Sequence, residues 1–338
     1  MKPTIICLTP VKNEAWILDR FLKSTSLWAD YIIIADQMST DGSRDIAKRY
    51  SKVILIDNPS ETFNELERKR LLVNEARKIE GQRLFITLDA DEMFSPEIFT
   101  SGEWEKILYL PKGTAINFQW SNFAPDGKNM WKGYFFPWGY MDDDFEDYDK
   151  GIPNTAIHCS RVPISERSPK YTVNTFSVIH FQYTDWDRMV HKHYYYQCLE
   201  VINNPMKSAV DIYRQYHHMD IVKKEEFLKI PQAWIESYRE KEIDILKVNR
   251  EENYWYDKEV LNLFEKYGIN KFKKVCVWNV DWTKKIIHFG KLNSYKYKDP
   301  RNVIDKIYQW WMAYSQKRMN NSLMIRRIDR MIMKLYNY

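Results

Sequence analysis

The chain of 338 residues carries a net charge of +5, with 44% apolar and 29% charged residues. This composition is typical of a folded, water-soluble protein with one large core and room for a smaller one. No dense basic stripe or recognition motif accompanies the mild positive charge, so we do not expect a nucleic acid as partner.

The four cysteines are Cys7, Cys159, Cys198 and Cys276, and they form no CxxC pair. Their separation argues against a zinc site or a disulfide framework and favours a reducing environment. Because the first residues lead directly into a strand-like segment, we expect no secretory signal. No apolar run reaches the roughly 18 residues of a membrane-spanning helix, so the expected location is the cytoplasm.

The first third of the chain alternates short apolar runs with segments of helical spacing. The expected strands are 4–9, 31–35, 53–56 and 84–88, and the expected helices are 14–28, 41–50 and 63–79. This alternation predicts right-handed crossovers and a mostly parallel sheet flanked by helices, which is an α/β fold.

The pattern changes after residue 114. Strand-like segments at 115–118, 134–138, 157–162 and 176–181 predict antiparallel or mixed additions to the sheet. A helix is expected at 187–201, followed by a mainly helical stretch at 211–267 that breaks at Pro231. We therefore expect an α/β domain over residues 1–205 and a mainly helical extension over residues 206–338.

Three polar segments follow expected strands, at residues 9–14, 36–43 and 89–92. In open parallel sheets, ligands bind outside the carboxyl ends of the strands. If these strands are parallel, the three segments lie along one edge of the sheet and share one ligand.

The third segment contains the acidic pair Asp89 and Asp91. Carboxylates after a buried strand are costly unless they are paired, solvated or bound to a cation, and Mg²⁺ commonly binds to carboxylates and phosphate oxygens together. Such a site would neutralise a diphosphate leaving group. The alternative is a solvated acidic turn in which Ser95 or Asp91 caps the next helix.

The other two segments offer hydrogen-bonding groups at the same edge. Asp36 would accept a hydrogen bond from a base imide or a ribose, and Thr9 and Glu14 stand where a nucleoside would lie. The alternatives are local: Ser39 or Asp41 would serve as a helix N-cap, and residues 10–14 would form a simple turn before a helix.

Together the three segments resemble the nucleotide-binding half of glycosyltransferase family 2, which has the GT-A fold. The matching residues are Pro10, Asn13, Glu14, Asp36, Ser39, Thr40, Asp41, Gly42, Ser43, Asn74 and 88–92. The resemblance covers roughly residues 2–100. The Ala29-Asp30 pair before the second expected strand resembles the sequence of the branch that includes lipopolysaccharide-core-type transferases. The chain departs from the family pattern at Lys12, Gln37, Met38 and Val73. The family has a basic residue at the position of Val73, and in this chain Arg70 lies about one helical turn earlier.

The resemblance implies a nucleotide-sugar donor, such as a UDP-sugar, and a bound Mn²⁺ or Mg²⁺. It implies that the donor is contacted by Thr9, Pro10, Asn13, Glu14, Asp36, Ser39, Asp41, Arg70, Asn74, Asp89 and Ala90. The metal would be held by Asp89, Asp91 and His180. For His180 and for His158, which has a weaker claim, a purely structural role is the alternative.

The resemblance also implies an inverting transfer, in which a carboxylate takes the proton of an acceptor hydroxyl. Glu146 and Asp147, within the acidic run at residues 142–149, are the candidate bases, and Glu166 is a further one. The acidic run equally fits a solvated loop. The acceptor would be a glycan or a lipid-linked molecule, as in polysaccharide biosynthesis.

The tail from residue 300 onwards interleaves apolar side chains around Trp310 and Trp311 with the basic residues Arg326, Arg327 and Arg330. Such a pattern is typical of an interfacial amphipathic segment, which would give peripheral contact with the cytoplasmic face of a membrane. A helix docked on the core or on a second subunit is the alternative, and the oligomeric state stays open.

Two other functions compete with glycosyl transfer. A sugar nucleotidyltransferase shares the architecture and the need for a metal, but it would show a glycine-rich phosphate loop where residues 10–14 stand. A non-catalytic glycan-binding protein would have no need of the intact pair of Asp89 and Asp91.

Overall fold

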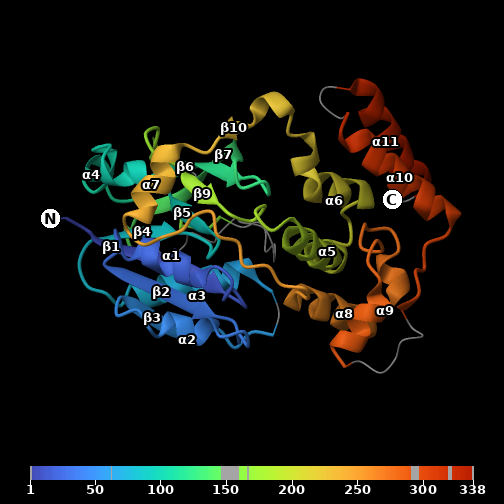
Figure 1. Cartoon of the computed structure of the whole chain (residues 1–338), viewed down its shortest axis with the longest axis horizontal. Helices are drawn as coiled ribbons and strands as arrows, with labels where there is room; N and C mark the ends of the chain where they lie inside the picture. Colours follow the sequence, from blue (N-terminus) through green and yellow to red (C-terminus); the bar gives the residue numbers. More distant parts are fainter. Residues whose placement is uncertain are drawn as a thin grey trace. The chain divides into compact units, whose positions relative to one another are not determined.

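The computed structural model describes residues 2–61, 63–145, 160–165, 167–290, 297–318 and 322–336 (Figure 1). The chain forms two compact units. Unit 1 comprises Met1–Asp185 and Leu228–Arg250, and unit 2 comprises Trp186–Phe227 and Glu251–Tyr338. The predicted division into domains at residue 205 stays a prediction.

Unit 1 is built on a ten-stranded sheet with the order β3-β2-β1-β4-β7-β6-β9-β5, to which β8 adds on β6 and β10 on β7. The strands are β1 (Thr4–Val11), β2 (Tyr31–Asp36), β3 (Val53–Asp57), β4 (Arg83–Thr87), β5 (Glu92–Phe94), β6 (Ala115–Phe123), β7 (Asn129–Met141), β8 (Lys170–Thr172), β9 (Val178–His180) and β10 (Leu228–Lys229). Strands β1 to β4 are parallel, whereas β7 pairs antiparallel with both β4 and β6. The predicted α/β fold with mixed additions is confirmed.

Three of the parallel strands, β1, β2 and β4, are buried on both faces. The helices of unit 1 are α1 (Leu18–Thr25), α2 (Ser43–Ala47), α3 (Glu65–Ala76), α4 (Glu103–Ile107) and α7 (Gln232–Arg239), with the 3₁₀ helix η1 (Pro96–Phe99). In β1, Ile5 and Cys7 share a core with α1, whereas Ile6 and Leu8 share one with α3. Burial on both faces explains why these strands read as continuous apolar runs in the sequence.

An aromatic cluster anchors the short strand β5. The ring of Phe94 lies 5.0 to 5.9 Å from those of Trp28, Trp104, Phe118 and Phe176. Rings at these separations in tilted and edge-on arrangements stabilise a core beyond their buried area. Because Phe94 is two residues from Glu92, this packing fixes the acidic turn against the rest of unit 1.

Unit 2 is helical. Its helices are α5 (Trp186–Asn203), α6 (Ala209–Tyr216), α8 (Trp255–Tyr267), α9 (Trp282–His288), α10 (Val303–Gln316) and α11 (Leu323–Tyr336), with the 3₁₀ helices η2 (His218–Ile221), η3 (Lys224–Glu226) and η4 (Ile269–Phe272). The carboxylate of Asp257 is buried in α8 and pairs with His191 of α5 and with Lys285 of α9. The predicted helical character of this region is confirmed.

Several predicted bounds differ from the observed ones. The helix expected at residues 41–50 is shorter, because α2 begins after Gly42, whose φ of 96° is left-handed, and ends at Ala47. Half of the strand expected at 157–162 lies outside the described residues, and its described residues 160–162 form no strand.

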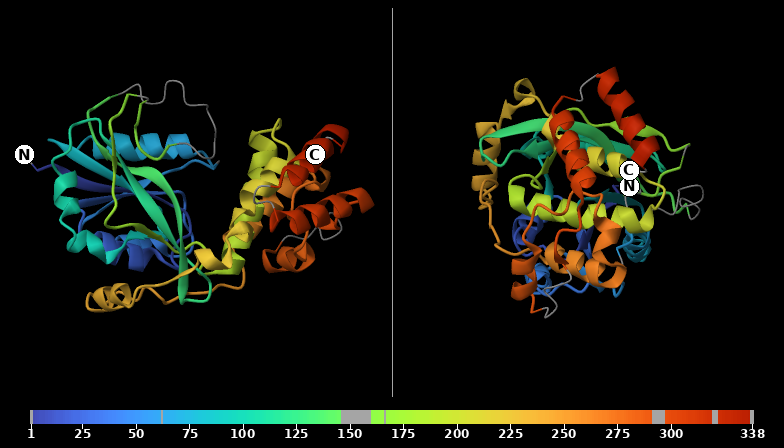
Figure 2. Two further views of the ribbon diagram at one scale, coloured as in Figure 1. Left: turned by 90° about the horizontal axis from the view of Figure 1, so that it is seen from above. Right: turned by 90° about the vertical axis from the view of Figure 1, so that its right-hand side faces the viewer.

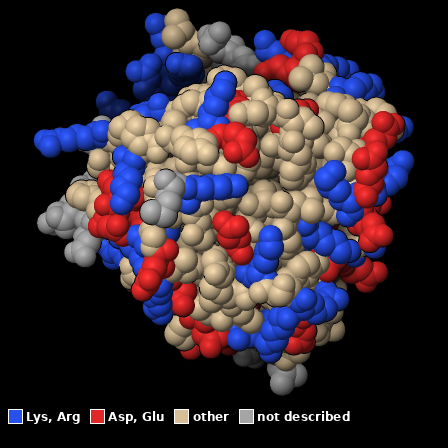
Figure 3. Space-filling model, turned by 90° about the vertical axis from the view of Figure 1, so that its left-hand side faces the viewer, with Lys and Arg blue, Asp and Glu red and all other residues tan. Residues whose placement is uncertain are grey.

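Charged side chains on the face of the molecule drawn in Figure 3 are of mixed sign. Basic and acidic residues alternate there with uncharged ones, in keeping with the mild net charge of +5. Over the described ranges of the chain, no helix is both long and apolar enough to cross a bilayer.

Candidate active site

The three polar segments singled out in the sequence lie along one edge of the sheet. In the parallel registers, Val11 of β1 stands beside Asp36 at the end of β2, and Leu8 of β1 stands beside Thr87 at the end of β4. Asp89 follows Thr87 by two residues, so Asp36 and Asp89 flank the carboxyl end of β1 from its two sides. This is the edge at which open parallel sheets bind ligands.

Side chains of the second segment hold the first segment in place. The hydroxyl of Ser39 accepts a hydrogen bond from the backbone N–H of Asn13 at 2.8 Å, and that of Ser43 accepts one from the N–H of Glu14 at 2.9 Å. In return, the amide oxygen of Asn13 accepts from the N–H of Thr40 at 2.8 Å. Asn13 adopts a left-handed φ of 55°, a conformation that asparagine tolerates better than most residues.

Asp41 combines two roles. Its Oδ2 accepts from the N–H of Ala15 at 2.8 Å, and its Oδ1 accepts from the N–H of Ser43 at 2.9 Å, at the start of α2. The N-cap of α2 is Gly42, so the N-cap predicted at Ser39 or Asp41 is wrong, and Asp41 instead bonds the start of the helix from one residue before the cap.

Asp36 is the buried acid of this edge, with 1% of its surface exposed. Its Oδ2 accepts from the N–H of Ser39 at 3.1 Å and from Arg44 at 2.8 Å. Its Oδ1 is buried, and no described residue donates a hydrogen bond to it. An unsatisfied carboxylate oxygen costs free energy, and a ligand N–H or O–H would relieve that cost.

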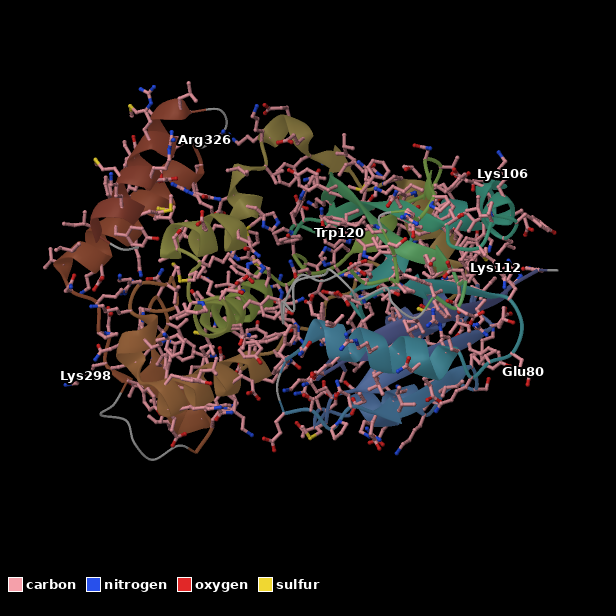
Figure 4. All side chains as sticks on the ribbon, turned by 180° about the vertical axis from the view of Figure 1, so that it is seen from behind. Glu80, Lys106, Lys112, Trp120, Lys298 and Arg326 are labelled. Carbon is pink, nitrogen blue, oxygen red and sulfur yellow. The ribbon has the colours of Figure 1, made fainter. Side chains whose placement is uncertain are left out.

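The acidic turn after β4 is organised around Glu92, whose side chain is fully buried. Its Oε2 accepts from the backbone N–H of Asp89 at 2.9 Å, and its Oε1 accepts from the indole N–H of Trp120 at 2.9 Å. Figure 4 shows where Trp120 lies in the sheet. The guanidinium of Arg161 bridges the two acids, at 2.5 Å from Glu92 and 2.6 Å from Asp89.

Burial and neighbouring charges shift the pKa values of two residues at this turn. Burial raises the pKa of Glu92 to about 7, the charges of Asp89 and Asp91 add to the rise, and Arg161 opposes it. Burial alone would lower the pKa of Arg161, but the facing carboxylates of Asp89 and Glu92 outweigh it and raise that pKa. Arg161 therefore stays charged beside Asp89 and Glu92.

His180 joins this turn through strand pairing, because β9 places it beside Glu92 of β5. Its Nε2 lies 3.7 Å from Oδ2 of Asp91, which is 7% exposed, and its Nδ1 lies 3.0 Å from the amide oxygen of Asn122. The ring stacks on Trp120 at 4.8 Å. A single tautomer can therefore present Nε2 to a cation while Nδ1–H donates to Asn122.

Two carboxylates and an imidazole are suitable ligands for Mn²⁺ or Mg²⁺. Asp91 and His180 already face each other, but the Oδ2 of Asp89 is engaged by Arg161. Within the part of the chain that the structure describes, no group of three acidic, histidine or cysteine residues has the arrangement of a finished metal site. The donor set fits a divalent cation, provided that Asp89 leaves Arg161.

The remaining predicted donor contacts lie on α3. Arg70 and Asn74 are four residues apart and both exposed, on the side opposite the buried Leu72, Val73 and Ala76. One helical turn separates residues four apart, so the two side chains share a face.

The start of the acidic run has a structural role. Asp142 has no exposed side-chain surface, and it pairs with Arg77 at 2.8 Å and with Arg83 at 2.9 Å. Asp143 accepts from the hydroxyl of Tyr140 at 2.7 Å, and Asp144 also pairs with Arg83. The candidate bases Glu146, Asp147 and Glu166 lie outside the described residues, as does His158.

The sequence did not point to Arg161 or Trp120. Arg161 is 69 residues from Glu92 and stands in no motif, and Trp120 is one of 13 tryptophans. Only the tertiary fold brings these two donors to the acidic turn. One indication of such partners was present in the sequence, because an acid such as Glu92 in a buried strand requires hydrogen-bond donors or a cation.

Residues 6–152 match the model of the family described as Glycosyl transferase family 2. The matched segment contains all three polar segments, the acidic turn and the start of the acidic run. The further likeness to the branch with lipopolysaccharide-core-type transferases stays a prediction. Among curated proteins, none matches the chain.

Three solved structures have partial similarity to the chain. Glucosyl-3-phosphoglycerate synthase from Mycobacterium tuberculosis, in complex with Mn²⁺, uridine diphosphate and phosphoglyceric acid, is 18% identical over 36% of this chain and 43% of that one, with a TM-score of 0.26. S. aureus TarS 1-349 is 9% identical over 86% of this chain and 79% of that one, with a TM-score of 0.33. A second S. aureus TarS structure is 11% identical over 83% and 47%, with a TM-score of 0.35. The chain thus spans less than half of the first and third of these proteins.

Proposed function

We propose that this protein is an inverting glycosyltransferase that moves a sugar from a nucleotide-diphosphate sugar to a hydroxyl group of an acceptor. Two features carry the proposal, because they lie on one edge of a parallel sheet. One is the buried acid Asp36, to whose Oδ1 no described residue donates a hydrogen bond, and the other is the acidic turn at residues 89–92. The match of residues 6–152 to glycosyl transferase family 2 supports it.

In the proposed complex the nucleoside lies over the carboxyl end of β1. The free Oδ1 of Asp36 accepts a hydrogen bond from the base or the ribose, and UDP is the nucleotide we expect. Thr9, Pro10, Asn13, Glu14, Ser39, Asp41, Asp89 and Ala90 surround the nucleotide, and Arg70 and Asn74 extend the site from α3. The hydrogen bonds between the first two segments keep this surface rigid before the donor arrives, which lowers the entropic cost of binding.

The donor's diphosphate is proposed to lie over the acidic turn, with Asp89, Asp91 and His180 as ligands of Mn²⁺ or Mg²⁺. When bound, the cation neutralises the charge that develops on the leaving nucleoside diphosphate. Arg161 faces the same turn and adds a second positive charge beside the phosphates. Trp120 and Asn122 hold Glu92 and His180 in position through their hydrogen bonds.

The acceptor hydroxyl requires a carboxylate that takes its proton as it attacks the anomeric carbon. Because Asp142 is locked between two arginines, we assign this role to Glu146 or Asp147, further along the acidic run. The acceptor class we propose is a glycan or a lipid-linked molecule of a polysaccharide pathway.

The two alternatives predict different properties. A nucleotidyltransferase would release pyrophosphate from a nucleoside triphosphate, yet the segment that follows β1 contains no glycine. A non-catalytic glycan-binding protein would bind sugars without hydrolysing a donor. Slow hydrolysis of one nucleotide sugar out of a panel would favour the transferase over both.

Calorimetric titration with uridine diphosphate and Mn²⁺ tests the proposed site directly. We expect Asp91→Asn to weaken Mn²⁺-dependent binding by at least about tenfold, because the substitution removes a charged ligand. Asp45→Asn, which removes an exposed acid from α2, is the matched control and should bind as the wild type does. Equal affinities of the Asp91 variant and the wild type would refute the assignment.

A further inference from the structure

The helix α10 exposes a stripe of large apolar side chains. Val303, Ile307, Trp310 and Tyr314 are 72%, 60%, 63% and 45% exposed. Their spacing of four, three and four residues places them along one side of the helix. The opposite side holds buried residues such as Met312, which packs against α6. The inner side of α10 is already packed against the protein. A contiguous apolar stripe on its outer side is unusual for a surface that contacts only water.

The outer side of α11 mixes apolar and basic side chains. Leu323, Met324 and Met331 are 69%, 65% and 51% exposed. They are interleaved with exposed basic residues, which are Arg326, Arg327, Arg330 and Lys334. Arg327, Arg330, Met331 and Lys334 surround one open hollow on the surface. Three cations around one hollow form a suitable place for an anionic group.

The exposed charge of the two helices is of one sign. The acids Asp305 of α10 and Asp329 of α11 are buried, at 2% and 5% exposure. Asp305 accepts from the N–H of Asn302 in a helix cap, and Asp329 pairs with Arg214 of α6 at 2.9 Å. The exposed charged residues of the two helices are therefore all basic, and they are Lys306, Arg326, Arg327, Arg330 and Lys334; the exposed Lys317 and Arg318 follow α10 directly.

Both helices have their inner sides against the same helix. Arg214 of α6 donates to the hydroxyl of Ser315 in α10 at 2.8 Å as well as to Asp329 in α11. The outer sides of α10 and α11 consequently point away from α6. Figure 2 shows the two helices next to α6, with both towards the viewer in its right-hand panel. The apolar stripe and the basic residues thus belong to one outer surface of unit 2.

We propose that the outer surface of α10 and α11 binds to an anionic lipid bilayer. Apolar side chains such as Trp310 would enter the interfacial region, while the arginines and lysines would contact lipid phosphates at the end of their flexible stems. A second copy of the chain fits less well, because it would bring one basic surface against another, and the centres of protein interfaces are depleted of lysine. This inference goes beyond the proposed transfer and does not depend on it.

Sedimentation of the full chain with lipid vesicles tests the proposal. We expect binding to vesicles of phosphatidylcholine with about one third phosphatidylglycerol, and much weaker binding to phosphatidylcholine alone. Replacing Arg326, Arg327 and Arg330 together by glutamine should lower the partition coefficient about a hundredfold, since each basic residue near an anionic surface contributes about fivefold. Trp310→Ser should also weaken binding and should remove the blue shift of tryptophan fluorescence on vesicles.

The matched control removes the same charge elsewhere. Lys106, Lys112 and Lys128 of unit 1 are exposed, and their joint replacement by glutamine should leave vesicle binding unchanged. Figure 4 labels Lys106 and Lys112 as well as Arg326, which extends from α11. Equal losses in the two triple variants would overturn the proposal, and so would a wild-type chain that ignores anionic vesicles. A Trp310-dependent dimer in solution that binds no vesicles would show that a second copy covers this surface.

Discussion

Replacing Arg161 by glutamine removes the cation that two acids of the candidate site share. Glu92 has no exposed side-chain surface, whereas Arg161 and Asp89 are 26% and 38% exposed. The loss therefore falls mainly on Glu92, which would keep its hydrogen bonds from the N–H groups of Asp89 and Trp120 but lose its charged partner.

The magnitude follows from this burial. Breaking a fully buried ion pair costs about 3–5 kcal/mol, while an exposed pair contributes at most about 1 kcal/mol. Arg161 is a quarter exposed, so water partly screens its charge, and Glu92 keeps two donors. We therefore expect Arg161→Gln to lower the free energy of unfolding by about 2–3 kcal/mol, or the midpoint of thermal unfolding by roughly 5–10 °C.

Thermal unfolding in metal-free buffer at mildly alkaline pH measures this loss, because Glu92 of the wild-type chain, with a pKa of about 7, is then mostly ionised. Arg167→Gln removes an exposed charge six residues away and should leave the midpoint unchanged. Arg161→Lys, which keeps the charge but not the forked geometry, should fall between the two. An Arg161→Gln variant as stable as the wild type would mean that the guanidinium does not support Glu92.

Two further predictions concern buried ionisable side chains away from the acidic turn. Burial lowers the pKa of His193 well below its usual 6.5, so the folded chain holds this ring neutral while the unfolded chain protonates it. Stability should therefore fall as the pH drops below about 6.5, and thermal midpoints should depend less on pH in His193→Gln than in the wild type; an unchanged dependence would contradict this. Asp142→Asn should cost about 3–5 kcal/mol in denaturant unfolding, because it leaves Arg77 and Arg83 facing a neutral group. Asp144→Asn, at an acid that is 59% exposed, should cost less than about 1 kcal/mol, and similar losses in both variants would argue against the role of burial.

Local patterns in the sequence predicted much of the fold. The alternation of apolar runs and helical segments in the first 90 residues gave the parallel strands, because β1, β2 and β4 are buried on both faces and must be apolar throughout. The same reasoning placed Asp36 and Asp89 at one edge. The strand expected at 134–138 is the middle of the longer β7, whose flanking Gly133 and Gly139 interrupt the strand pattern of the sequence.

Long-range pairing was beyond such reasoning. His180 reaches Glu92 only through the antiparallel pairing of β9 with β5, and β5 is three residues long. Arg161 lies in the segment expected as a strand at 157–162, but its described residues 160–162 form no strand, so the sequence pattern did not place it at the acidic turn. The alternative for Ser39 and Asp41, a helix N-cap, was wrong because Gly42 occupies that position. It also missed the connection to the neighbouring loop, because hydrogen bonds between residues 26 positions apart leave no local signature.

The cross-links between the first two loops affect how mutagenesis of this edge should be interpreted. Ser39 holds the backbone of Asn13, and Ser43 holds that of Glu14, so truncating either hydroxyl frees a loop whose own residues are unaltered. An inactive Ser39→Ala enzyme would therefore identify a scaffold defect as readily as a missing substrate contact. A second substitution in residues 12–15 that restores activity to Ser39→Ala would show that the defect lies in the position of the loop and not in a lost substrate contact.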